Sequence, residues 1–290
     1  MATAEKGKPA KAAKASSGGK IDLATIAGLV VAVGGILTGL LMEGGKIQDV
    51  QQVTAAIIVL GGTIGAVMVT TPQAILASAV RRLVSVFVDK SPNPALIIDE
   101  LIRYATKARK EGIVALEQDA EAIQDPFLRK AMNLAVDGTD LQQLRKMMEL
   151  EISLIEHAGE AEAKVYEAAG GYAPTVGIIG AVLGLIQVMK NLENIEEVGN
   201  GIAVAFVATV YGVGVSNLFF LPVGQKLKGR LHQVVQTKEL MLEGVIGIVE
   251  GLNPKLLRTK LEPYAASGAK VKQKAAAKQQ PAAKAVGAET

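Results

Sequence analysis

YAPTVGIIGAVLGLI, residues Tyr172–Ile186, contains no charged side chain but includes one proline and three glycines. Pro174, Gly177, Gly180 and Gly184 would make a poor helix in water. A bilayer tolerates such residues because neighbouring helices satisfy freed backbone groups and small residues let two helices approach closely. The stretch therefore predicts a membrane-spanning helix that packs tightly, either within this chain or against another one.

The apolar residues of the chain gather in a few long stretches. The composition is 50% hydrophobic and only 3% aromatic. A spanning helix needs about 20 mostly apolar residues. The first stretch lies too far from the N-terminus for a signal peptide and lacks a cleavage pattern. We therefore predict an all-α, four-span membrane protein with a helical cytoplasmic domain. The four stretches without Asp, Glu, Lys or Arg are Leu23–Met42, Gln51–Val80, Ala168–Met189 and Val198–Gln225.

The expected organisation alternates spans with helical soluble segments. Strand signals are weak throughout, and strong breakers in the main soluble portion occur only around Ser91–Pro94, Asp125–Pro126 and Gly138. The two ends of the chain are rich in Ala and Lys, a composition typical of disorder. We expect a disordered basic arm over 1–20, spans over 21–42, 51–71, 172–190 and 200–223, a cytoplasmic helical domain over 72–170, a charged cytoplasmic helix over 224–263 and a disordered tail over 264–290.

The distribution of charged residues predicts on which side of the lipid membrane each segment lies. Lysines crowd the N-terminal arm, and basic residues follow the second and fourth spans, whereas the two short connections are nearly neutral or acidic. The positive-inside rule then predicts an inner-membrane, multi-pass protein with both termini and the long middle segment in the cytoplasm. A basic arm next to a span is more typical of a topology signal than of nucleic-acid binding.

Residues that could carry catalysis are scarce. The chain has no cysteine, and its two histidines, His157 and His232, lie among charged helical residues. It contains no phosphate-binding loop and no paired metal-ligand spacing. We therefore expect no enzymatic activity, no metal and no cofactor. The spans also lack any ionisable group at depth, which ion-conducting proteins usually need. Either the protein moves no ions, or a partner chain brings the carboxylate.

Two prolines occupy corresponding places in the last two spans. Pro174 and Pro222 are both expected at cytoplasmic ends of their spans, at one membrane depth. Because proline frees a backbone carbonyl and bends a helix, the pair suggests a ring of hinges. The alternative is that Pro174 is a first-turn proline without a role in motion.

Four segments resemble one family of membrane proteins. They are GGYAPTVGIIGAVLGLIQVM at 170–189, AVAFVATVYGVGVSNLFFLPVGQKL at 203–227, VLGGTIGAVMVTTP at 59–72 and ARKEGIVALE at 108–117. Together they resemble the MotA/PomA flagellar stator family over roughly residues 20–255. The ExbB/TolQ energisers are more distant, since they have three spans and lack the cytoplasmic signature. An energiser of an envelope system remains the alternative, and a scaffold or four-span transporter without a motor role is a third hypothesis.

The resemblance implies partners and residue roles. The family forms a homopentameric ring around a dimer of MotB or PomB, whose membrane Asp accepts the ion. Ion flow turns the ring, which pushes on the rotor protein FliG and drives motility and chemotaxis. By motif, Arg109 and Glu117 fall on rotor-contact positions, Pro174 and Pro222 on functional prolines, and Thr209 on the ion path.

Ion identity depends on a missing hydroxyl. Sodium-driven members tend to carry Thr where this sequence has Ala181, and a desolvated sodium ion needs several oxygen ligands. We therefore expect proton transport, although Thr209 leaves sodium open.

On an unbroken helix Arg109 and Glu117 would lie on neighbouring faces, about 80° apart. Taken alone, each is typical of a solvated helix charge, and three neighbours could share the role: Lys107, Lys110 and Glu111.

Overall fold

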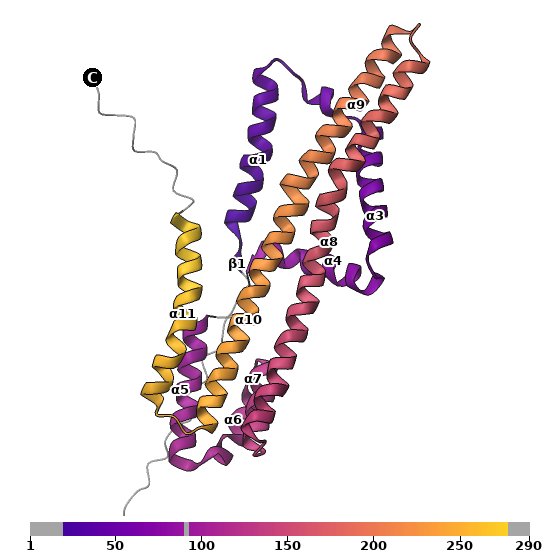
Figure 1. Ribbon diagram of the computed structural model, residues 1–290. Helices are drawn as coiled ribbons and strands as arrows, with labels where there is room; N and C mark the ends of the chain where they lie inside the picture. Colours follow the sequence, from indigo (N-terminus) through magenta and orange to yellow (C-terminus); the bar gives the residue numbers. More distant parts are fainter. Residues whose placement is uncertain (1–19, 90–92, 278–290) are drawn as a thin grey trace, which may run out of the picture.

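The computed structural model describes residues 20–89 and 93–277 (Figure 1). Residues 1–19 of the basic arm and 278–290 of the tail therefore lie outside the described residues. The described part contains four helical segments long and apolar enough to cross a membrane. This confirms the all-α, four-span prediction. The segments are α1 (Leu23–Met42), Ile47–Thr70, α8 (Leu141–Lys190) and the continuous run Ile195–Val249.

The second and fourth spans each contain a π turn, a local widening of the helix to i→i+5 bonding. In the second span, α2 (Val53–Ala56) passes through η2 (Ile57–Gly61) into α3 (Gly62–Thr70). In the fourth, α9 (Ile195–Val215) passes through η4 (Ser216–Phe220) into α10 (Leu221–Val249). The sequence pattern predicts both spans as regular helices, without these turns.

α8 is one helix of 50 residues that continues from the cytoplasmic domain into the third span. Asp140 caps it, since its Oδ1 accepts hydrogen bonds from the backbone N–H groups of Gln142 and Gln143. The helix runs without interruption through Gly170, Gly171 and Pro174. Pro174 is therefore an interior proline, and the first-turn alternative is wrong.

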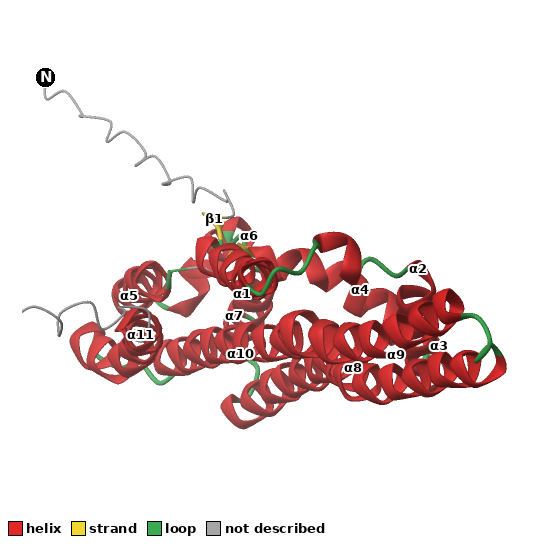
Figure 2. Cartoon of the chain, turned by 90° about the horizontal axis from the view of Figure 1, so that it is seen from above, coloured by secondary structure: helices red, strands yellow, loops and turns green. Residues whose placement is uncertain are grey.

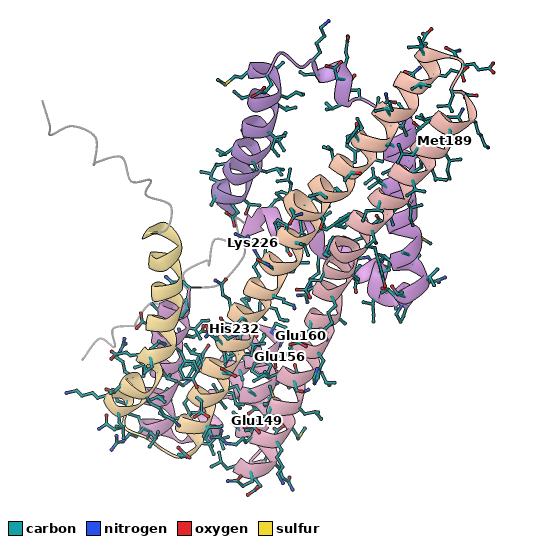
Figure 3. The ribbon with its side chains drawn as sticks, turned by 45° about the horizontal axis from the view of Figure 1, so that its top comes forward. Glu149, Glu156, Glu160, Met189, Lys226 and His232 are labelled. Atoms are coloured by element: carbon teal, nitrogen blue, oxygen red, sulfur yellow. The ribbon has the colours of Figure 1, made fainter. Side chains whose placement is uncertain are left out.

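α8 and the α9–α10 run lie side by side over their whole length, with α1 standing apart on one side and α3 on the other (Figure 1). The two long helices carry charge at one end and apolar side chains at the other. Figure 3 shows Glu149, Glu156 and Glu160 along one half of α8, with Met189 at its opposite end. This polarity divides the pair into a cytoplasmic half and a membrane half.

The cytoplasmic half is a helical domain with its own core. It contains α4 (Gln73–Phe87), α5 (Pro94–Glu111), η3 (Ile113–Leu116), α6 (Glu117–Ala122) and α7 (Pro126–Val136). These helices pack on the first part of α8, the last part of α10 and α11. Viewed from above, α5 and α11 lie side by side at one end of the pair (Figure 2). The largest fully buried side chains here are Phe127, Leu101, Leu116, Leu128, Met132, Leu144, Met148, Leu240, Ile246, Leu257 and Leu261.

Two helix boundaries and one short strand pair differ from what the sequence predicted. The expected helix over 224–263 breaks after Val249, because Gly251 adopts a left-handed φ of 67° and Pro254 then starts a new helix. This helix, α11 (Pro254–Ala277), includes residues 264–277, which composition had suggested would be disordered. The third difference is a minimal antiparallel pair of β1 (Lys20–Ile21) with β2 (Val88–Asp89).

Candidate functional site

The seam between α8 and α9 is built by glycines on both helices. A Cβ on Gly212 would lie 2.6 Å from the carbonyl oxygen of Ala173, and one on Gly184 would lie 2.8 Å from that of Gly201. Since real Cβ atoms do not approach backbone this closely, these positions admit only glycine. The predicted small-residue contacts therefore include contacts within this chain, and they fix the register of the two antiparallel helices.

This register brings the two predicted ion-path residues together. Gly180 faces Ala208, since a Cβ on Gly180 would meet the Ala208 methyl at 2.8 Å. Ala181 and Thr209 each follow one of these facing residues. In antiparallel helices, one step of about 100° from facing positions turns both side chains to the same side of the pair. Ala181 and Thr209 therefore share one level and one side of the seam, and both are half-buried.

The opposite side of the seam is covered by the second span. A Cβ on Gly62 would meet Val176 of α8, and Ile58 lies against Gly180. Ala55 and Val59 are buried in a cluster with Val207 and Ala208. The side that carries Ala181 and Thr209 is left uncovered by the part of the chain that the structure describes. The exposed apolar residues of the two helices include Ile178, Val182, Leu185, Ile202, Phe206, Val210 and Val213.

The hydroxyl of Thr209 is partly engaged within its own helix. Its Oγ1 donates to the backbone carbonyl of Ala205 at 3.2 Å, which leaves the oxygen lone pairs free to accept. Ala181 supplies no polar side-chain atom. The site thus offers one hydroxyl oxygen and no carboxylate of its own.

Pro174 and Pro222 do not lie at one membrane depth, so that part of the hinge expectation is wrong. Gly177 faces Gly212, since a Cβ on Gly212 would lie 3.0 Å from the Gly177 Cα. Pro174 comes three residues before Gly177 and Pro222 ten residues after Gly212, so in this antiparallel pair the two prolines differ by seven residues, about 10 Å of helix. The reason is the register: the glycine contacts align the α8 proline with the last turn of α9, before the π turn and Pro222. Pro174 is half-buried, and Pro222 is exposed directly after the π turn η4.

Ser216 is a site residue that the sequence analysis did not predict. The structure places it in the seam, where its Oγ donates to the backbone carbonyl of Gly170 at 2.6 Å in a buried environment. The signal that could have found it is the spacing of Pro174 four residues after Gly170. A proline at that spacing leaves the Gly170 carbonyl without its helical donor.

Arg109 and Glu117 lie on either side of a sharp corner. Gly112 has a φ of 86° and ends α5, so the expectation of one unbroken helix through both residues is wrong. Both charged side chains are exposed. An ion pair of 2.7 Å between Lys107 of α5 and Asp119 of α6 holds the corner. Lys107 therefore stabilises the corner through this ion pair, while Arg109 and Glu117 are exposed on either side of the turn.

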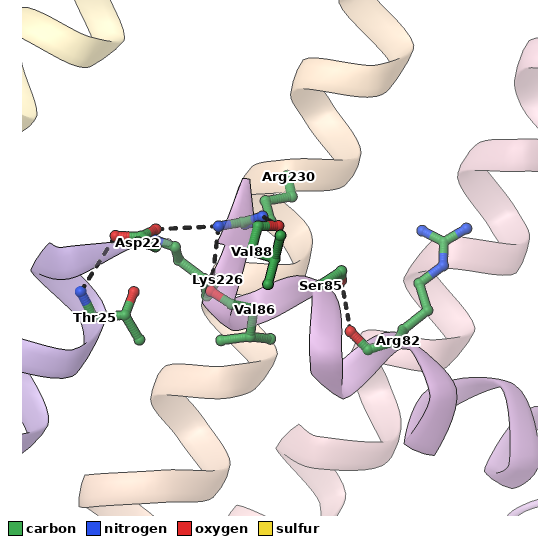
Figure 4. Close-up of polar contacts among 8 residues, drawn as sticks. All are labelled: Asp22, Thr25, Arg82, Ser85, Val86, Val88, Lys226 and Arg230. Atoms are coloured by element: carbon green, nitrogen blue, oxygen red, sulfur yellow. Dashed lines mark hydrogen bonds and ion pairs between the residues drawn. The ribbon is translucent and has the colours of Figure 1, made fainter. Parts of the chain in front are cut away.

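A second polar cluster, which sequence reasoning missed, joins the first span to α10 (Figure 4). Asp22 caps α1 by accepting from the backbone N–H of Thr25, and its Oδ2 pairs with Lys226 at 2.6 Å and Arg230 at 3.1 Å. Arg230 also donates to the carbonyl of Val86 near the end of α4 and to that of Val88 in β2. We call Asp22, Lys226 and Arg230 the clasp. It matters because α1 has no buried residue of its own.

A further ionic cluster, centred on Glu243, lies at the cytoplasmic end of α10. Burial tends to raise the pKa of Glu243, but hydrogen bonds and charge from Lys260 and Arg145 outweigh it and hold that pKa below its ordinary value. The two partners lie 2.7 and 2.8 Å from the carboxylate. Arg145 belongs to α8 and Lys260 to α11, so the cluster joins three helices. Within residues 20–89 and 93–277, no three His, Asp or Glu side chains gather as metal ligands.

Comparison with known proteins gives a consistent result. The model of the MotA/TolQ/ExbB proton channel family matches residues 119–240, and the motility protein A N-terminal model matches residues 26–112. A motility protein A from Helicobacter pylori is 36% identical over 248 residues, which cover 86% of this chain and 96% of the relative.

Solved structures agree with these sequence matches. The structure of C. jejuni MotAB superposes with a TM-score of 0.81 at 34% identity, covering 84% of this chain and 96% of that one. The flagellar MotAB stator complex from Bacillus subtilis gives a TM-score of 0.79 at 31% identity, covering 85% and 97%. The similarity thus extends over nearly the full length of each relative.

Proposed function

Since the chain belongs to the MotA/TolQ/ExbB proton channel family and is a stator subunit of the motility protein A type, we propose that it forms an ion channel with a MotB-type single-span partner. Ion flow through this channel drives torque on the rotor protein FliG. The protein is a multi-pass protein of the inner membrane. We further propose that both termini face the cytoplasm and that five copies form a ring around the partner.

One observation carries the proposal. Ala181 and Thr209 share the side of the α8–α9 seam that the second span leaves open, and the charge-free stretches 23–42, 51–80, 168–189 and 198–225 supply no carboxylate. An ion crossing hydrocarbon needs such a group. A partner helix with a membrane Asp would complete the site on that open side.

Complementation tests this function. We expect the chain, expressed with a MotB-type partner in a strain without its own stator, to restore swimming. The matched control is the same pair with the partner's membrane Asp changed to Asn, which should restore none. Swimming that does not require the partner would contradict the proposed channel.

The transported ion is a proton in this proposal. Ala181 offers no oxygen, and the Thr209 hydroxyl is a single ligand, whereas a desolvated sodium ion needs several oxygen ligands. Swimming should persist without sodium and stop when a protonophore is added. Loss of swimming on sodium removal alone would instead assign sodium.

The Arg109–Gly112–Glu117 corner is the proposed rotor contact. It presents one positive and one negative side chain on a turn fixed by the Lys107–Asp119 ion pair. Exposed charges of this kind orient a charged partner more than they add affinity. The ExbB/TolQ-like alternative, an energiser of an envelope protein, has no use for such a contact, so the corner favours the stator.

A further inference from the structure

Pro174 creates a defect in α8 that the rest of the chain must repair. In a regular helix, the N–H of residue 174 would donate to the carbonyl of residue 170. Proline has no N–H, so the Gly170 carbonyl loses its donor. Gly170 is buried in the seam. A buried carbonyl without a partner is costly, and a donor from elsewhere is needed.

The facing helix supplies that donor. Ser216 is 1% exposed, and its Oγ lies 2.6 Å from the Gly170 carbonyl oxygen. Hydroxyls within helices usually donate to a carbonyl of their own helix, as Thr209 does to Ala205. Ser216 instead bonds across the seam, at the position where Pro174 has removed the helical partner.

Ser216 also belongs to the second irregular turn. It is the first residue of the π turn η4, and its carbonyl accepts the backbone N–H of Leu221, the residue before Pro222. Leu221 packs directly on Gly170: a Cβ there would lie 2.5 Å from the leucine Cδ2 atom. One serine therefore bonds to both proline-associated breaks, through its side chain to one and through its backbone to the other.

We propose that Ser216 is a positioning residue, a latch that couples the Pro174 break in α8 to the π turn and Pro222 break in the fourth span. While the latch is closed, α8 and α9–α10 keep their register at Gly170. A change in geometry at one proline then alters the hydrogen bonding at the other. The coupling of the two breaks follows from the contacts alone, and its role in ion-driven motion rests on the proposed stator function.

A double-mutant cycle tests the latch. In Pro174→Ala, the new N–H at position 174 can donate to Gly170, so the Ser216 hydroxyl becomes dispensable. We expect Ser216→Ala to lower the SDS midpoint of unfolding of the full chain, purified with its partner, in the original background. The shift should be much smaller in the Pro174→Ala background. Equal shifts in both backgrounds would overturn the latch.

Two further variants separate the latch from general damage. Ser78→Ala removes a hydroxyl that donates to Ile75 of its own helix, so its shift should not depend on residue 174. Ser216→Cys keeps a side chain of similar size but has only a weak donor, and should give an intermediate shift. A cysteine variant as stable as the original chain would show that packing, not the hydrogen bond, matters.

Swimming speed reports the functional part. With equal amounts of chain in the membrane, Ser216→Ala should slow swimming while Ser78→Ala leaves it unchanged. Unchanged speed in Ser216→Ala would overturn the coupling role and leave the stator function intact. Absence of swimming with the unaltered chain would instead count against the stator function, and the unfolding cycle would still decide the latch.

Discussion

At the scale of residues, the packing and polarity of the membrane half depend on groups that particular residues lack. The seam glycines have no Cβ, Ala181 has no hydroxyl and Pro174 has no N–H. The first absence lets two backbones touch, the second leaves the proposed ion site poor in oxygen, and the third leaves a carbonyl to which Ser216 donates. Each absence can be read from the sequence, whereas its consequence depends on which residue lies opposite.

Gly184→Ala should weaken the seam. The added methyl would lie 2.8 Å from both the Gly201 carbonyl oxygen and the Ala205 nitrogen, so backbone must move. Overpacking of this kind costs about 1–3 kcal/mol. Gly171→Ala is the control, because its Cβ meets nothing within 4 Å and alanine favours a helix. SDS unfolding measures both, and a Gly184→Ala chain as stable as the control would contradict the close approach.

Glu243→Gln should destabilise the cytoplasmic domain in a pH-dependent way. The Glu243 pKa is depressed in the folded chain, so its stabilisation is present above the ordinary value of 4.5 and is lost as pH falls through the folded-state pKa. At neutral pH we expect a loss of about 1 kcal/mol. The difference between variant and original should vanish in acid. Urea unfolding followed by circular dichroism checks this, and a gap that widens in acid would refute it.

At the scale of elements, α1 differs from the other spans. It has no buried residue. Its cytoplasmic end is attached by the clasp of Asp22, Lys226 and Arg230, and by backbone hydrogen bonds of the β1–β2 pair and of the Asp22 N–H to the Phe87 carbonyl. Lys226 and Arg230 lie one and two turns after Pro222 on the same face of α10. The clasp therefore fixes the start of α1 and the end of α4 to α10 directly beyond the second proline.

Asp22→Asn should loosen α1 without removing its cap, since asparagine caps helices as well as aspartate. Because the chain has no cysteine, spin labels can be placed at exposed Val31 and Gln225 alone. With labelled chains diluted among unlabelled ones, we expect the distance distribution between α1 and α10 to broaden. Asp140→Asn, which alters the α8 cap, should leave it unchanged. Identical distributions in all three proteins would argue against the clasp.

At the scale of the whole molecule, the α8 and α9–α10 pair connects the proposed ion site to the domain that carries the proposed rotor contact. One end of the pair carries Ala181 and Thr209, and the other contributes to the core that supports the Arg109–Glu117 corner. No flexible linker interrupts either helix between these ends. The proposed ion site and the proposed rotor contact are therefore joined by continuous helices, along which a displacement at the membrane end would be transmitted.

Reversing both corner charges, Arg109→Glu with Glu117→Lys, should abolish or strongly reduce swimming. The two residues are exposed and outside the core, so stability and membrane level should change little. Glu111→Lys with Lys110→Glu, a nearby pair of opposite charges, tests whether the effect is local. Motility in soft agar with immunoblotting measures both, and retained swimming in the first double variant would rule out this rotor contact.

The sequence by itself determined the four spans, the helical class, most breakers and the family resemblance. These follow from composition and from backbone rules that act within a few residues: charge-free length, Pro and Gly positions, and Asp or Asn caps such as Asp125 and Asp140. The helical breaks at Gly112 and Gly251 escaped prediction, because a glycine alone does not say whether its φ is positive.

Only the tertiary structure decided which residues meet. A long antiparallel pair has many registers of similar hydrophobicity, and the glycine contacts select one of them. That register separates the two prolines in depth, brings Ala181 and Thr209 to the same open side, and places Ser216 against the carbonyl that Pro174 left without a donor. The clasp likewise joins residues about 200 positions apart. Such pairings depend on shape and charge complementarity across the fold, which no local pattern encodes.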